Sequence, residues 1–127
     1  MQPLKVVVAD DHAGFRELLT SFLRAQGVEV VGVATNGEEA VEQADHCTPD
    51  LVLMDISMPK LNGFEAARTI KRLHPRTKVI IVSSHTGDVY RKAALESMAD
   101  GYIEKDSMKT ALSSLIAKER GSVRVAI

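Results

Sequence analysis

The sequence predicts an α/β fold, a doubly wound (βα)5 arrangement in which a five-stranded parallel sheet is sandwiched between helices. Two observations carry this prediction. Short apolar runs alternate five times with segments whose apolar residues recur at helical spacing. The connections are short, and strands that alternate with helices in this way form right-handed βαβ units. The 127 residues, 45% of them hydrophobic and 26% charged, fit one domain of ordinary globular composition.

Composition and charge exclude several classes of function. With 16 basic and 17 acidic side chains the net charge is −1, so bulk electrostatics does not favour binding of nucleic acid by this chain. The only cysteine, Cys47, cannot close an intrachain disulfide, and no paired Cys or His spacing indicates zinc. Apolar runs such as residues 6–9 and 79–82 are far shorter than the roughly 20 residues of a membrane-spanning helix. We therefore expect a soluble cytoplasmic domain with no membrane partner.

The first strand and helix are predicted before residue 28. Residues 4–9 form a near-continuous apolar run that ends at Asp10. The apolar residues that follow recur at i, i+3, i+4, i+7 and i+8, which is one face of a helix. Gly27 stands where a helix commonly ends in a left-handed residue. The predicted buried face consists of Phe15, Leu18, Leu19, Phe22 and Leu23.

The second unit is predicted from a strand at residues 28–34 and a capping pattern directly after it. Thr35 and Glu38 have the spacing of a capping box, which predicts a helix from there to about Cys47. Pro49 then breaks the helical pattern.

The third strand, residues 51–54, is short and wholly apolar, which is typical of a central strand covered on both faces. Asn62 and Glu65 repeat the capping-box spacing and predict the start of the next helix, which ends before Pro75. The predicted apolar stripe of this helix consists of Phe64, Ala67, Ile70 and Leu73.

The last two units follow the same alternation. Residues 78–82 and 101–104 predict the fourth and fifth strands, with a weaker helix from about residue 88 to residue 98 between them. Its predicted inward residues are Ala93, Ala94 and Met98. The last helix, predicted to end near Gly121, has an apolar face of Met108, Ala111, Leu112, Leu115 and Ile116. The expected domain spans residues 1–121, and residues 122–127 are a C-terminal tail or linker stub.

A candidate site lies where the strands end. In open parallel sheets, ligands bind beyond the carboxyl ends of the strands, so the residues just after each strand converge on one edge. Any one aspartate there could be a helix cap or a turn residue. Three carboxylates about 4 Å apart, however, repel by about 4 kcal/mol per pair at an effective dielectric constant of about 20. The residues that converge are Asp10, Asp11, Asp55, Ser83, Ser84 and Lys105.

The charges of this cluster point to a divalent cation. Three aspartates and one lysine sum to −2, and all-oxygen, carboxylate-rich ligand sets favour Mg²⁺, which often binds beside a phosphate. A carboxylate can attack phosphorus to give an acyl phosphate. Asp55 is the candidate acceptor because it ends the central strand. Ser83 and Lys105, on flanking strands, could reach the phosphoryl oxygens and stabilise the developing charge.

The segments that carry this chemistry resemble those of response-regulator receiver domains of two-component signalling. The matching sequences are Val-Ala-Asp-Asp-His at residues 8–12, Leu-Val-Leu-Met-Asp-Ile-Ser-Met-Pro at residues 51–59 with Gly63 following, Ile-Val-Ser-Ser-His at residues 81–85 and Gly-Tyr-Ile-Glu-Lys at residues 101–105. The likeness covers residues 5 to 118. It implies a flavodoxin-like strand order of 2-1-3-4-5.

The resemblance also implies roles for the metal and acceptor residues. Asp55 matches the phosphoacceptor that receives its phosphoryl group from a sensor histidine kinase or a phosphotransfer protein. Asp11 and the main-chain carbonyl of Ser57 match direct Mg²⁺ ligands beside Asp55, while Asp10 matches a partner that acts through water.

Three further positions match the switching machinery of receivers. Ser83 matches the switch hydroxyl that moves toward the phosphate, and Lys105 matches the ammonium that pairs with it. Tyr102 matches the aromatic residue that couples the site to the surface of the fourth helix, fifth strand and fifth helix. Such a domain would catalyse only its own phosphorylation and dephosphorylation.

The sequence departs from the common receiver pattern at several positions. Asp106 and Ser107 stand where many receivers carry a proline, which resembles receivers of LuxR-type transcriptional regulators and predicts an N-cap for the last helix. Met98 stands where a glycine often ends the fourth helix. Ser57 and His85 flank the line of attack, at positions that influence the lifetime of the phosphate.

Three other functions are weighed against this one. An aspartyl-phosphate phosphohydrolase of the haloacid-dehalogenase kind expects Asp-x-Asp and a cap domain, whereas Asp10 and Asp11 are adjacent. A dinucleotide- or flavin-binding module expects a glycine-rich loop after the first strand. A receiver-like interaction module would not need intact Asp11, Asp55 and Lys105. Homodimerisation and a C-terminal DNA-binding output domain beyond residue 127 stay open as family expectations.

Overall fold

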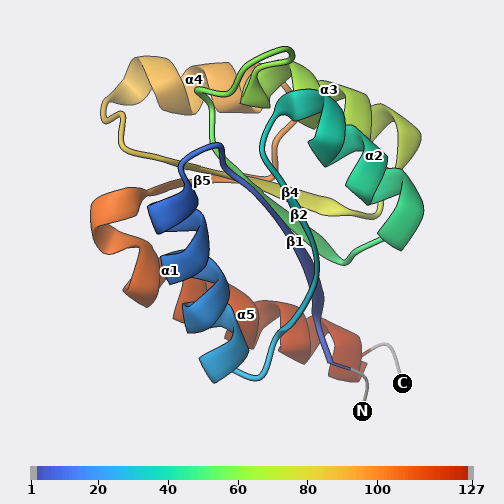
Figure 1. Ribbon diagram of the computed structural model, residues 1–127. Helices are drawn as coiled ribbons and strands as arrows, with labels where there is room; N and C mark the ends of the chain where they lie inside the picture. The colour runs from blue at the N-terminus through green and yellow to red at the C-terminus, as the bar shows by residue number, and fades with distance from the viewer. Residues whose placement is uncertain (1–2, 126–127) are drawn as a thin grey trace.

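The computed structural model describes the backbone of residues 3–125 and the side chains of residues 3–120. Within this range all five strands pair in parallel, in the order β2-β1-β3-β4-β5, and alternate with five α-helices (Figure 1). The strands are β1 Lys5–Ala9, β2 Glu29–Ala34, β3 Leu51–Met54, β4 Lys78–Ser83 and β5 Gly101–Glu104. The helices are α1 Ala13–Ala25, α2 Gly37–Cys47, α3 Gly63–Leu73, α4 Asp88–Glu96 and α5 Met108–Val125. The flavodoxin-like class and strand order are as predicted.

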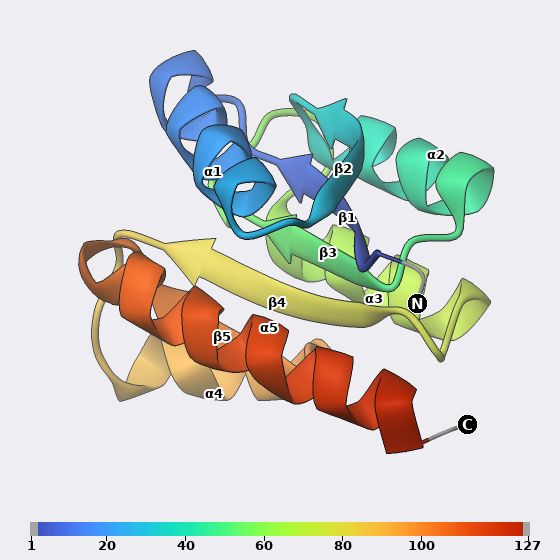
Figure 2. The same ribbon diagram turned by 90° about the horizontal axis from the view of Figure 1, so that it is seen from below.

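The helices form two layers, with α1 and α5 on one face of the sheet and α2, α3 and α4 on the other (Figures 1 and 2). The central strands bury both of their faces. In β1, Val6 and Val8 pack toward α1 and α5, whereas Val7 and Ala9 pack toward the opposite layer. All four residues of β3 are buried. This explains why both strands appear in the sequence as unbroken apolar runs.

The helix caps follow the predicted chemistry, with one shift in register. Asn62 begins α3, and its side-chain oxygen accepts a hydrogen bond from the amide of Glu65 (3.0 Å), as the capping box predicts. The box predicted from Thr35 and Glu38 is wrong by one residue. Asn36 begins α2 by accepting from the amide of Glu39 (2.8 Å), while the Glu39 carboxylate accepts from both the amide and the hydroxyl of Thr35 (2.8 Å each). Asparagine is itself among the strongest N-caps.

Three residues predicted on buried faces are exposed. Leu18 is 49% exposed because it lies at the flank of the α1 stripe, whose centre is Leu19 and Leu23. Leu73 is 55% exposed because it is the last residue of α3. Met98 is 56% exposed and adopts a left-handed φ of 69° after the end of α4, the conformation for which a glycine would be suited.

The last helix differs from its prediction at both ends. A 3₁₀ turn, Lys105–Ser107, precedes α5, and the Ser107 hydroxyl donates to the carbonyl of Glu104 (3.4 Å). The helix then continues past Gly121 to Val125, since one interior glycine weakens a helix by only about 1 kcal/mol. The boundary at residue 121 and the role of residues 122–127 stay predictions, and residues 126–127 lie outside the described part of the chain.

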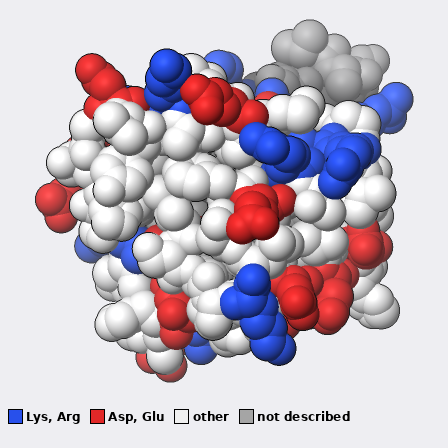
Figure 3. Space-filling view, turned by 90° about the horizontal axis from the view of Figure 1, so that it is seen from above, with Lys and Arg blue, Asp and Glu red and all other residues white. Residues whose placement is uncertain are grey.

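The surface over α2, α3 and α4 carries charges of both signs. Seen from above the view of Figure 1, lysine and arginine side chains alternate with aspartate and glutamate side chains, and neither sign covers the face (Figure 3). None of the helices described between residues 3 and 125 has the length and apolar character needed to cross a membrane.

Candidate functional site

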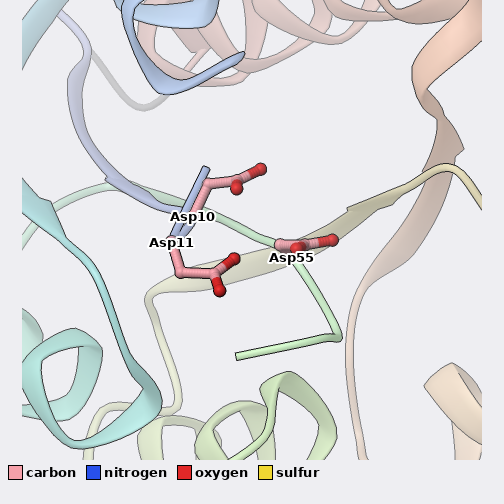
Figure 4. A group of neighbouring side chains, drawn as sticks. All are labelled: Asp10, Asp11 and Asp55. Atoms are coloured by element: carbon pink, nitrogen blue, oxygen red, sulfur yellow. The ribbon is translucent and has the colours of Figure 1, made fainter. Parts of the chain in front are cut away.

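Three aspartates meet at the carboxyl edge of the sheet, as the sequence predicts. Asp10 and Asp11 follow β1 and Asp55 follows β3, and the two strands are neighbours that pair Ala9 with Met54. The amide of Asp55 donates to the carbonyl of Ala9 (2.9 Å), which continues the parallel pairing into the site. One oxygen of each of the three carboxylates lies within 4.8 Å of the others (Figure 4). The sheet register therefore creates the acidic cluster.

Lys105 partly neutralises this cluster. Its ammonium lies 3.0 Å from an oxygen of Asp10 and 3.7 Å from an oxygen of Asp55. The same nitrogen lies 4.1 Å from the centre of the Phe15 ring, within the range of a cation–π contact. Asp10 is only 2% exposed, and its second oxygen accepts from the amide of His12 (2.8 Å). The buried carboxylate is thus both paired and hydrogen-bonded, the condition under which burial of a charge is tolerated.

Asp55 has a different electrostatic environment. Burial, with the side chain 11% exposed, raises the pKa of the Asp55 carboxyl above its ordinary value. The negative charge of Asp10 raises this pKa further, and Lys105 opposes the rise. Without a bound cation, the cluster therefore disfavours the ionised form of Asp55.

The donor set fits a small divalent cation. Asp11 is exposed and opens the cluster to water, whereas Asp10 and Asp55 are largely buried. Mg²⁺ binds through one or two carboxylates and keeps several waters, so a half-open set of three carboxylates matches its requirements. Ser57 is exposed in the loop after Asp55. In that loop the carbonyls of Ile56 and Pro59 accept main-chain hydrogen bonds, and no such bond to the Ser57 carbonyl is found in the described chain.

Two glycines allow the loops of the site to approach one another. A Cβ on Gly63 would lie 2.0 Å from the carbonyl oxygen of Asp55, and one on Gly37 would lie 1.8 Å from the carbonyl oxygen of Leu61. Both distances are far below contact, so α2 and α3 can begin this close to the loop after β3 only with glycine at these positions. Gly63 also donates its amide to the carbonyl of Ile56 (2.9 Å). The first residues of α2 and α3 therefore restrict the path of the loop that follows Asp55.

Ser83 and Tyr102 lie on the strands next to Asp55. Ser83 is the last residue of β4 and is fully buried, and β4 pairs Ile81 with Met54, so Ser83 lies one residue beyond the level of Asp55. The Ser83 hydroxyl oxygen accepts from the amide of His85 (3.1 Å). The hydroxyl of Tyr102 donates to the carbonyl of His85 (2.7 Å). The backbone of His85 thus hydrogen-bonds to both Ser83 and Tyr102.

Some residues at the site were not singled out for it from the sequence. Phe15 was predicted only as a core residue, yet its ring also contacts the Lys105 ammonium. Arg16 donates to the main-chain carbonyl of Asp10 (2.8 Å), a contact that no motif indicates. Gly37, at the very start of a helix after a strong cap, is the one sequence feature that indicates a close backbone approach there.

The fold and the site define an α/β protein of the flavodoxin-like class with an acidic, candidate metal-binding pocket at the carboxyl edge of its sheet. The chain belongs to the response regulator receiver domain family, whose model matches residues 6–117. It is a signalling module rather than a classical enzyme.

Known relatives agree with this assignment. The transcriptional regulatory protein DegU of Brevibacillus brevis is 39% identical over 110 residues, which cover 86% of this chain and 47% of DegU. A two-component response regulator of the LuxR family from Aurantimonas has a solved structure with a TM-score of 0.84 and 29% identity, over 92% of this chain and 87% of that one. The CheX–CheY–BeF3–Mg²⁺ complex of Borrelia burgdorferi contains a chain with a TM-score of 0.82 and 26% identity, over 88% of this chain and 85% of that one.

The similarity to receivers of LuxR-type regulators is as predicted. The chain spans about half the length of the first curated relatives that it matches.

Proposed function

We propose that the protein is a phosphorylation-activated receiver that takes a phosphoryl group from a sensor histidine kinase or a phosphotransfer protein onto Asp55 in a Mg²⁺-dependent reaction. The observation that carries the proposal is the meeting of the Asp10, Asp11 and Asp55 carboxylates with the Lys105 ammonium at the end of the central strands. The resulting change in the site alters a surface that partners bind.

The chemistry follows from the residues present. A carboxylate oxygen of Asp55 attacks phosphorus, the new P–O bond forms, and the bond from phosphorus to the donor atom breaks, leaving an acyl phosphate. Lys105, already 3.7 Å from Asp55, places a positive charge beside the transferred group. The Ser83 hydroxyl can supply a hydrogen bond to a phosphoryl oxygen. Attack of water on phosphorus later releases phosphate and regenerates the carboxylate.

The metal is assigned to Asp10, Asp11, Asp55 and the main-chain carbonyl of Ser57. Bound there, Mg²⁺ would supply the positive charge that permits three carboxylates and a phosphoryl group to share one site. The presence of Mg²⁺ in the related Borrelia complex supports this assignment.

Ser83 and Tyr102 are proposed as the switch. Their shared link through His85 supports this role, because a movement of the Ser83 hydroxyl toward a phosphoryl group must change the His85 backbone that Tyr102 contacts. The switch would bias a two-state element rather than bind a substrate.

The partners are proposed from the relatives. The relatives are about twice as long as this chain, which supports a C-terminal DNA-binding output domain in a longer protein. A homodimer is proposed from the family resemblance alone. We propose a cytoplasmic location, where such signalling proteins meet their kinases, and no nucleic-acid contact by the receiver itself.

The test is phosphorylation by a small donor. Incubation with Mg²⁺ and acetyl phosphate should add the mass of one phosphoryl group, and both Asp55→Asn and removal of Mg²⁺ should abolish the gain. Asp106→Asn, at an exposed aspartate of the turn after β5, is the matched control and should leave the gain intact. Unchanged mass in the wild type, or repeated turnover of a phosphate ester as expected of a phosphohydrolase, would refute the proposal.

A further inference from the structure

The loop between β4 and α4 has one residue that contacts both switch positions. The amide of His85 donates to the hydroxyl oxygen of Ser83 (3.1 Å), and its carbonyl accepts from the hydroxyl of Tyr102 (2.7 Å). A hydroxyl that accepts one hydrogen bond still has a hydrogen of its own, which Ser83 can donate to a phosphoryl oxygen. The placement of His85 therefore decides how both side chains are oriented.

The side chain of His85 is held by α4. Its ring stacks on the ring of Tyr90, with 4.5 Å between the centroids and an angle of 11° between the planes. The next residue of the helix, Arg91, places its guanidinium 5.3 Å from the centre of the Tyr102 ring and pairs with the carboxylate of Glu104 (2.9 Å). Two consecutive residues of α4 thus hold the loop and the aromatic switch residue.

Apart from these contacts, the helix is held at its far end, where Arg68 of α3 donates to the carbonyl of Glu96 (3.1 Å). Ala94 is its one buried residue, whereas Val89 and Leu95 are 77% and 73% exposed. The helix begins after Gly87 with no side-chain cap. Isolated surface ion pairs contribute little to stability. Because the Arg68 contact lies at the last residue of α4, the stack and the Arg91 contacts are the ones that bear on the position of its first turns.

We propose that Tyr90 and Arg91 are positioning residues for phosphorylation: they hold His85 and Tyr102 in place, and through His85 they hold the Ser83 hydroxyl ready for the incoming phosphoryl group. This inference rests on the proposed function and concerns how α4 regulates phosphorylation at the same site. Coupling is reciprocal, so a phosphoryl group that draws on Ser83 also stabilises the position of α4. Loosening α4 lowers the fraction of molecules with Ser83 correctly placed.

The test uses matched pairs of variants. Arg91→Met removes the charge that contacts Tyr102 and Glu104, and Lys92→Met removes the neighbouring charge from an exposed position of the same helix. Tyr90→Leu removes the stacked ring, and Tyr90→Phe keeps it. We expect Arg91→Met and Tyr90→Leu to lower the maximal rate of phosphorylation by acetyl phosphate about threefold, the effect of one partly exposed cation–π or stacking contact. The Mg²⁺ concentration for half-maximal rate should not change, and Lys92→Met and Tyr90→Phe should match the wild type.

A spectroscopic measurement separates positioning from a general loss of structure. The chain has only two tyrosines, so fluorotyrosine labelling of the Tyr90→Phe protein leaves Tyr102 as the single ¹⁹F signal. Adding Arg91→Met should shift or broaden that signal, and adding Lys92→Met should not. Equal rates for Arg91→Met and Lys92→Met, or an unmoved Tyr102 signal, would overturn the inference and leave the proposed function standing. A wild-type chain that takes up no phosphoryl group would overturn both.

Discussion

At the scale of single residues, the acidic pocket is a balance between burial and charge pairing. Lys105 lies closer to Asp10 than to Asp55, at 3.0 Å against 3.7 Å. The buried Asp10 also accepts from the amide of His12, whereas burial and the charge of Asp10 raise the pKa of Asp55 more than Lys105 and the amide of Ile56 lower it. Asp55, the residue proposed to accept the phosphoryl group, therefore has a raised pKa that a bound cation would lower.

The raised pKa of Asp55 predicts how stability depends on pH. The folded state binds the Asp55 proton more tightly than the unfolded chain does, so the protonated Asp55 carboxyl stabilises the folded state at low pH. This stabilisation is lost as pH rises from the ordinary pKa of 3.8 through the raised pKa of the folded state. Urea unfolding without Mg²⁺ should show this loss in the wild type. Asp55→Asn should remove it and be the more stable protein at neutral pH, while the exposed Asp106→Asn keeps the wild-type slope. An Asp55→Asn protein that loses stability with pH as the wild type does would contradict the assignment.

Gly63 predicts a steric effect on the acceptor loop. Gly63→Ala should lower the free energy of unfolding by about 2 kcal/mol and slow phosphorylation, because a Cβ 2.0 Å from the Asp55 carbonyl forces the loop to move. Gly14→Ala is the control, since its nearest neighbour would be 3.4 Å away and alanine is the better helix former. Urea unfolding and acetyl phosphate kinetics measure both. Equal behaviour of the two variants would show that the close approach is not needed.

At the scale of elements, capping and burial set which helices are firmly held. Helix α3 has a side-chain cap and four buried residues, whereas α4 has no side-chain cap and one buried residue. The end of α4 is also strained, because Met98 adopts a left-handed conformation that costs a non-glycine residue free energy. Of these two helices, the less firmly anchored one thus lies beside Ser83 and Tyr102, the residues proposed as the switch, and such a switch needs a movable element.

The capping residue of α2 can be identified by mutation. Asn36→Ala should lower the free energy of unfolding by about 1 kcal/mol, because it removes a nearly buried cap from the amide of Glu39. Glu38→Ala should change it by no more than a few tenths, because Glu38 is exposed. Thermal or urea unfolding decides the matter. A larger loss for Glu38→Ala would restore the capping box predicted from the sequence.

At the scale of the whole molecule, metal binding is linked to folding. The three carboxylates come from two separate loops and meet only when β1 and β3 are paired, so the unfolded chain has no equivalent site. The pairing of β4 with both β3 and β5 brings Lys105, which follows β5, to 3.0 Å from Asp10. A metal ion that binds at this site therefore binds the folded protein and stabilises it relative to the unfolded chain.

This linkage predicts stabilisation by Mg²⁺. At a concentration tenfold above its dissociation constant, Mg²⁺ should raise the free energy of unfolding by about 1.4 kcal/mol. Asp11→Asn should weaken the effect strongly, and Glu17→Gln, at an exposed acidic residue of α1, should not. Urea unfolding with and without Mg²⁺ at constant ionic strength measures it. Equal stabilisation of the wild type and Asp11→Asn would place the ion elsewhere.

Local patterns in the sequence determined the strands, the helices, their order and the acidic residues at the carboxyl edge. They did so because apolar periodicity and strand ends depend on near neighbours and on the general geometry of parallel sheets. Only the tertiary structure decided that Leu18 and Leu73 face solvent, that Asn36 caps α2, and that Arg91 and His85 meet Tyr102 from different elements. These features depend on distances between segments far apart in the chain, which side-chain packing sets and no local spacing encodes.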